Sequence, residues 1–122
     1  HDLLQKHPGE FAALIMEPMN VAEPDQGYFD ALHELLNDND VLLVFDEIIT
    51  GFRFALGGAQ ALYNARPDLS CFGKSMGNGM PISAVMGRAD IMHEMEEIFF
   101  SGTFGGETLS IAAAEPSTPD PT

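Results

Sequence analysis

Apolar and polar positions follow a strand–helix–strand pattern in the first half of the chain. Residues 11–16 form a short apolar run that ends at Glu17 and Pro18, and residues 41–45 form a second apolar run without alternation. Between these runs, apolar residues recur at helical spacing over residues 28–36, with acidic and amide side chains on the other face. Strands that are apolar on both sides are typical of parallel sheets, so the pattern predicts a βαβ unit.

The second half of the chain has shorter elements. We expect helices and strands in this order: a helix over residues 58–65, strands over 69–73 and 82–87, and helices over 90–98 and 107–114. The segment between the last two strands is too short for a helical crossover, so these strands are predicted to be antiparallel. The predicted fold class is therefore α/β, with a mostly parallel sheet and one antiparallel strand.

Composition and charge narrow the classes of function. The chain has 122 residues, 45% of them hydrophobic, with a mean hydropathy of +0.01, which is enough apolar material for one packed domain. Nineteen acidic residues against five basic ones give a net charge of −14. Such a surface repels phosphate backbones and anionic lipids, so we expect neither nucleic-acid binding nor membrane binding.

Cysteine and histidine usage points to a reducing compartment and to no metal. Cys71 is the only cysteine, so no internal disulfide can form, and a cytoplasmic location is the default expectation. No apolar run is long enough to cross a bilayer, and the first residues lack the features of a signal peptide. The four histidines are scattered without the spacing of metal ligands, so we expect no metal site.

Two candidate reactive residues follow predicted strands. Asp46 comes directly after residues 41–45, and Lys74 comes directly after residues 69–73. Ligands of open α/β sheets gather outside the carboxyl ends of parallel strands, so the two side chains are expected to face one ligand. Taken singly, an acid after a strand is often a helix cap, and a lone lysine is usually a surface residue.

The surroundings of Lys74 favour a chemical role. It lies in the segment FGKSMGNGMP, where glycines allow the backbone to approach a ligand closely. A desolvated lysine has a lowered pKa, and its neutral amine is available for Schiff-base chemistry. A phosphate-binding P-loop is the competing interpretation, but its first glycine would fall at Asp68. A nucleotide-binding domain is disfavoured because no Gly-x-Gly-x-x-Gly follows a strand.

Three ordered segments match a known protein family. VFDEIITGFR (residues 44–53) resembles the aspartate segment of class III pyridoxal-phosphate (PLP)-dependent aminotransferases. The Gly73–Lys74 pair followed by GNGMPISA (residues 77–84) resembles their lysine segment, and SGTFGG (residues 101–106) resembles the next loop. Within the family, the pattern is most similar to glutamate-1-semialdehyde aminomutase and its aminotransferase relatives.

The resemblance also implies how the chain is organised. It extends from about residue 11 to residue 114, so residues 1–114 are expected to be part of the doubly wound, fold-type-I large domain. Residues 115–122 contain three prolines and no core residue, and we expect a disordered tail. The family's enzymes are several hundred residues long and this chain does not begin with Met, so we expect it to be a fragment.

The resemblance implies four site residues. Lys74 would form the Schiff base with PLP and move the proton, and Asp46 would pair with the pyridine nitrogen. Ile48 would pack against one face of the cofactor ring, unless it is an ordinary core residue. Thr103 would contact the phosphate of the PLP in a neighbouring subunit, unless it is an ordinary helix N-cap. This last role implies a homodimer.

The implied reaction is the transfer of an amino group between a small-molecule amino donor and a carbonyl acceptor. Intramolecular transfer of the aminomutase type is the first alternative, although residues 104–107 depart from the aminomutase pattern and favour a transaminase. An inactive gene fragment that acts only as a structural or interaction piece is the second alternative. Glu47 and Arg53 also match the family, and we expect structural roles for them.

Overall fold

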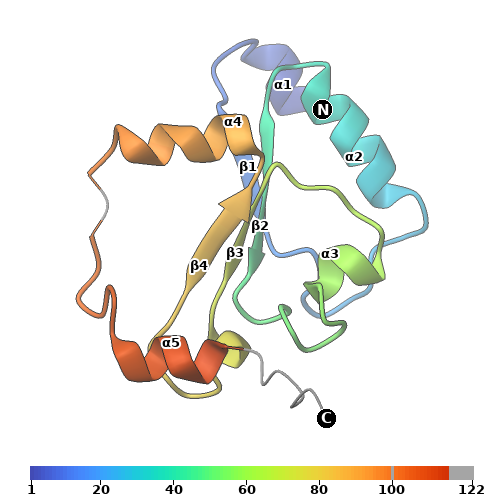
Figure 1. Cartoon of the computed structure of the whole chain (residues 1–122). Coiled ribbons are helices and arrows are strands. Elements are labelled where there is room, and N and C mark those ends of the chain that lie inside the picture. Colours follow the sequence, from blue (N-terminus) through green and yellow to red (C-terminus); the bar gives the residue numbers. More distant parts are fainter. Residues whose placement is uncertain (100, 116–122) are drawn as a thin grey trace.

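Four strands form one sheet, and they lie side by side in the order in which they occur in the chain (Figure 1). The computed structural model describes residues 1–99 and 101–115. The strands β1, β2 and β3 are parallel, and β4 is antiparallel to β3, so the predicted fold class is confirmed. Their bounds are Ala13–Met16 (β1), Leu42–Glu47 (β2), Leu69–Phe72 (β3) and Ala84–Gly87 (β4).

Helices cover both sides of this sheet. Figure 1 shows α2 and α3 on one side and α4 and α5 on the other. None of the helices in the described part of the chain is long and apolar enough to cross a membrane. The helical elements are α1 (Asp2–Lys6), α2 (Tyr28–Asn37), α3 (Gly58–Leu62), the 3-10 turn η1 (Lys74–Met76), α4 (Ala89–Met92), the 3-10 turn η2 (His93–Glu96) and α5 (Thr108–Ala114).

The core lies between β2 and α2. Leu43 and Phe45 point to this side of the sheet and are fully buried, because successive strand residues face opposite sides. They meet the apolar stripe of α2, where the rings of Phe29 and Phe45 pack edge to face with centroids 5.2 Å apart. This packing fixes β2, the central strand whose carboxyl end carries the candidate site.

The strand predicted over residues 82–87 begins only at Ala84, and three predicted helices also have wrong boundaries. The helix predicted over residues 58–65 ends at Leu62. Two residues later, Asn64 adopts a positive φ of 50°. The helix predicted over residues 90–98 is one α-helical turn followed by a 3-10 turn. Three glutamates near its end oppose the helix dipole, which explains why the α-helix does not continue. The helix predicted from residue 107 begins at Thr108.

A buried aspartate joins three strands at the end of the sheet remote from Asp46. The Oδ2 atom of Asp68 accepts a hydrogen bond from the backbone N–H of Leu43 at 2.8 Å, and its Oδ1 atom accepts one from Arg88 Nη1 at 2.8 Å. The backbone is close here as well, because a Cβ on Gly87 would collide with the Asp68 carbonyl oxygen. Asp68 therefore holds β2, β3 and the end of β4 in register.

Candidate functional site

Asp46 lies inside β2 and not directly after a strand as predicted. The parallel pairing with β3 continues through Asp46 opposite Cys71 and Glu47 opposite Phe72, so β2 extends two residues beyond the apolar run. The Asp46 carboxylate is half-buried, and its Oδ1 atom accepts a hydrogen bond from the backbone N–H of Ile48 at 3.0 Å. The carboxylate is therefore held at the strand end with Oδ2 left for a ligand.

Lys74 follows β3 at the same edge of the sheet, as the sequence predicted. It is exposed and begins the 3-10 turn η1, and it has a positive φ of 31°. Positive φ is uncommon for residues other than glycine and often marks functional positions. Within the described residues no ion pair joins Lys74 to Asp46, so its amine is not neutralised by that carboxylate.

Ile48 bridges the two candidate residues. Its backbone N–H holds Asp46, and its Cγ2 atom lies 3.4 Å from the position that a Cβ on Gly73 would occupy. Gly73 is buried and directly precedes Lys74. Ile48 is half-buried, which leaves part of an apolar side chain exposed between the carboxylate and the lysine turn. An aromatic ligand ring could pack against such a surface.

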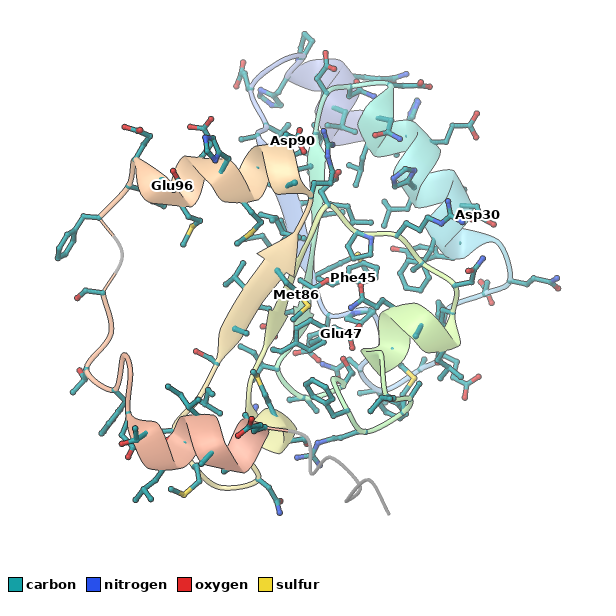
Figure 2. All side chains as sticks on the ribbon, viewed as in Figure 1. Asp30, Phe45, Glu47, Met86, Asp90 and Glu96 are labelled. Atoms are coloured by element: carbon teal, nitrogen blue, oxygen red, sulfur yellow. The ribbon has the colours of Figure 1, made fainter. Side chains whose placement is uncertain are left out.

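Glu47 has contacts that the sequence did not reveal. Its side chain is 0% exposed and lies on the face of β2 that looks toward α3, as Figure 2 shows. Its Oε2 atom accepts hydrogen bonds from Thr50 Oγ1 at 2.6 Å and Ala59 N at 2.7 Å, and its Oε1 atom accepts one from Gln60 N at 2.8 Å. Glu47 therefore ties the segment after β2 to the first turn of α3.

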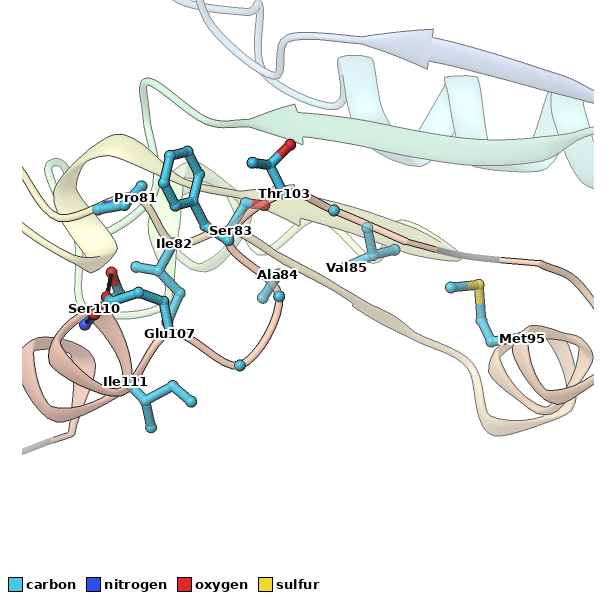
Figure 3. A pocket seen from close by; sticks show the side chains of 14 residues that line it. Pro81, Ile82, Ser83, Ala84, Val85, Met95, Thr103, Glu107, Ser110 and Ile111 are labelled. Atoms are coloured by element: carbon cyan, nitrogen blue, oxygen red, sulfur yellow. Dashed lines mark hydrogen bonds between the residues drawn. The ribbon is translucent and has the colours of Figure 1, made fainter.

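Thr103 lies on the loop before α5. Figure 3 shows it with residues 81–85 around a pocket of about 710 Å³, which neither of the two candidate catalytic residues lines. The alternative that Thr103 caps a helix is wrong, because Glu107 is the N-cap of α5 and accepts hydrogen bonds from Leu109 N and Ser110 N. Thr103 is thus exposed on a loop with no capping role.

Electrostatics link Asp46 to its neighbour in β3. Burial, and secondarily the negative charge of Asp46, raise the pKa of the Cys71 thiol above its ordinary value. Paired residues of neighbouring strands share a face of the sheet, so both side chains lie on the face that carries the candidate site. Cys71 is a free thiol and can report on the charge and position of Asp46.

The fold and this edge of the sheet define an α/β domain with a mostly parallel sheet, whose strands β2 and β3 lead to the candidate residues Asp46 and Lys74. The chain belongs to the class-III aminotransferase family, because the model of that family (Aminotransferase class-III) matches residues 1–117. It is 41% identical over 118 residues to the glutamate-1-semialdehyde 2,1-aminomutase of Francisella tularensis subsp. holarctica (strain LVS), over 91% of this chain and 27% of that protein.

Solved structures show the same fold. A β-phenylalanine aminotransferase from Variovorax paradoxus is 33% identical with a TM-score of 0.82, over 93% of this chain and 28% of that one. A transaminase with PLP bound is 25% identical with a TM-score of 0.84, over 93% of this chain and 29% of that one. The family resemblance inferred from the motifs is confirmed, and the chain spans little more than a quarter of the length of these relatives.

Proposed function

We propose that this chain carries the lysine and aspartate of a PLP site and that the protein transfers an amino group, as a class-III aminotransferase. The observation that supports this most directly is the register of β2 and β3. It sets Asp46 beside Cys71, which comes three residues before Lys74. Ile48 packs against Gly73, the residue directly before Lys74. A carboxylate, a primary amine and an apolar side chain are groups that suit the pyridine nitrogen, the aldehyde and the ring face of the cofactor.

The chemistry that PLP supplies when bound is an electron sink for the carbanion that forms at the substrate. Lys74 would hold the cofactor through its Nζ atom, and the same amine would move a proton between substrate atoms. Because Oδ1 of Asp46 accepts from Ile48 N, we assign Oδ2 to the hydrogen bond that keeps the pyridine nitrogen protonated. Ile48 provides an apolar surface for one face of the ring.

The position of Thr103 supports a homodimer as the working form. It is exposed and lines a pocket that includes neither Asp46 nor Lys74, so its hydroxyl is available to the cofactor phosphate of a second copy. Residues 1–114 would then be part of the cofactor-binding domain. The predicted disordered tail lies outside the described residues from residue 116 onward, and the cytoplasmic location stays a prediction.

The test compares Lys74 with Lys6, the other lysine of these 122 residues, and uses the protein as it is naturally translated. Lys74→Ala and Lys6→Ala remove equally exposed amines. With PLP and borohydride, wild type and Lys6→Ala should carry a pyridoxyl mass on the peptide that contains Lys74. Lys74→Ala should lose it, and kcat should fall at least about 10²-fold. Retention of the trapped cofactor and of turnover by Lys74→Ala would refute the assignment.

A second candidate function is aminomutase activity, which the 41% identity to a glutamate-1-semialdehyde 2,1-aminomutase favours. An aminomutase consumes glutamate-1-semialdehyde without a second substrate, whereas a transaminase needs an amino donor and a carbonyl acceptor. Turnover of that one compound alone would favour the aminomutase. Absence of both activities, together with absence of bound PLP, would favour the inactive fragment considered from the sequence.

A further inference from the structure

We propose that Glu47 is a positioning residue of the cofactor site, whose buried carboxylate fixes the segment that holds Asp46 and Ile48 beside the lysine turn. The inference rests on the proposed function and gives a role in the site to a residue that the sequence indicated only as structural. Glu47 touches neither candidate catalytic residue with its side chain. It acts through the backbone of the residues that follow it.

Glu47 is buried without a cationic partner among the described residues. A buried carboxylate is costly unless hydrogen bonds satisfy it, and here one hydroxyl and two backbone N–H groups do so. A solvent-exposed Ser, Thr or Asp would be sufficient to cap α3, so capping alone does not explain a buried glutamate.

The three hydrogen bonds of Glu47 hold the segment between β2 and α3. Thr50 lies near the start of the segment between β2 and α3, and Ala59 and Gln60 lie at its far end in the first turn of α3. One carboxylate thus fixes both ends of a segment without regular secondary structure. The backbone N–H of Gly51 also donates to the Glu47 carbonyl oxygen at 2.8 Å, which closes the first turn of this segment.

Ile48 connects this segment to the candidate site. Ile48 lies between Glu47 and Thr50, and it contributes both the N–H that holds Asp46 Oδ1 and the methyl group that lies against Gly73. If the segment were released, Ile48 would no longer fix the orientation of the carboxylate or the space above the lysine turn. The carboxylate of Glu47 on one face of the sheet therefore holds the backbone that orients the Asp46 carboxylate on the other face.

The test uses Glu47→Gln and two readouts. The amide keeps one oxygen acceptor but turns an N–H group toward another donor, so the three hydrogen bonds cannot all persist. The first readout is the pH dependence of Cys71 alkylation in the cofactor-free protein. Because Asp46 helps to raise the Cys71 pKa, Glu47→Gln should shift the alkylation midpoint toward the lower pH of an ordinary thiol. Asp46→Asn provides the reference for complete loss of that charge.

The second readout is the dissociation constant for PLP, which Glu47→Gln should raise on the order of tenfold or more because the ring contacts are misplaced. Glu34→Gln is the matched control, since it removes the same charge from an exposed position of α2 and should change neither readout. Thr50→Val removes only one hydrogen bond and should shift both readouts in the same direction by less. It serves as the test variant if Glu47→Gln does not fold.

The outcomes separate this inference from the proposed function. A folded Glu47→Gln or Thr50→Val protein with an unchanged Cys71 profile and unchanged PLP affinity would overturn the positioning role and leave the proposed function intact. A shifted Cys71 profile in a protein that binds no PLP in any form would support the positioning of Asp46 and sink the proposed function.

Discussion

Two glycines with nearly the same positive φ allow the Glu47 contact to be measured as a stability difference. Gly27 and Gly58 have φ values of 79° and 76°, so alanine is strained to a similar extent at both. A Cβ on Gly27 would meet nothing within 4 Å, whereas a Cβ on Gly58 would lie 2.5 Å from Glu47 Oε2. Gly58→Ala must therefore displace the carboxylate, and Gly27→Ala need not displace anything.

The expected loss of unfolding free energy in each variant follows from these contacts. The left-handed conformation costs an alanine about 1–2 kcal/mol, and the loss of unfolded-state freedom returns part of this, so we expect Gly27→Ala to destabilise by about 1 kcal/mol. Gly58→Ala has the same cost and also weakens at least one hydrogen bond to a charged group, which contributes about 1.5–3 kcal/mol. We therefore expect Gly58→Ala to destabilise the fold by about 2 kcal/mol more than Gly27→Ala.

The assay is urea unfolding followed by circular dichroism. With a slope of about 1–3 kcal/mol per molar urea, the two midpoints should differ by about 1 M. Equal midpoints for the two variants would show that the Glu47 carboxylate does not pack against the start of α3. The positioning role of Glu47 would then lose its structural basis.

Two further predictions concern other carboxylates. Asp68→Ala leaves the buried N–H of Leu43 without its acceptor and should lower the free energy of unfolding by about 2–4 kcal/mol in the same urea assay. The control is Asp90→Ala, which removes only an exposed partner of Arg88. An effect of Asp68→Ala no larger than that of the control would contradict the prediction. Hydrogen bonds to the first turn of α5, first that from the Ser110 side chain, lower the pKa of Glu107 below its ordinary value of 4.5. Its stabilisation of α5 is therefore complete above that value and is lost as the pH falls through the lowered pKa. Because acidification also slows the intrinsic exchange of amides, the quantity to measure is the protection of the α5 amides relative to an unstructured peptide at the same pH, which should fall on acidification. A fall of the same size in Glu107→Gln would refute the cap.

Local pattern was sufficient to predict most of the fold. The apolar stripe over residues 28–36 predicted α2, which is Tyr28–Asn37, and the short connection before β4 correctly predicted an antiparallel last strand. Short-range steric and hydrophobic rules determine these features. The end of β2 was misplaced because Asp46 and Glu47 are acidic, and only pairing with β3, a tertiary contact, keeps them in the strand.

The candidate site was predictable only in part. Lys74 and its glycine-rich turn were recognised by composition and motif, and the structure brings Ile48 to the same turn. The contacts of Glu47 could not be predicted, because its partners Ala59 and Gln60 are 12 and 13 residues away and act through their backbone N–H groups. Backbone donors have no sequence signature, so only the placement of α3 reveals them.

The sheet also has a consequence for how the chain folds during synthesis. Because β1, β2, β3 and β4 are adjacent in the order in which they are translated, each new strand finds its partner already present. The open edge of β1, β2 or β3 waits only for the next strand of the sheet, which shortens the time that this unpaired edge is exposed. The edge of β2 that pairs Asp46 with Cys71 is therefore completed when β3 emerges, and the turn with Lys74 is translated directly afterwards.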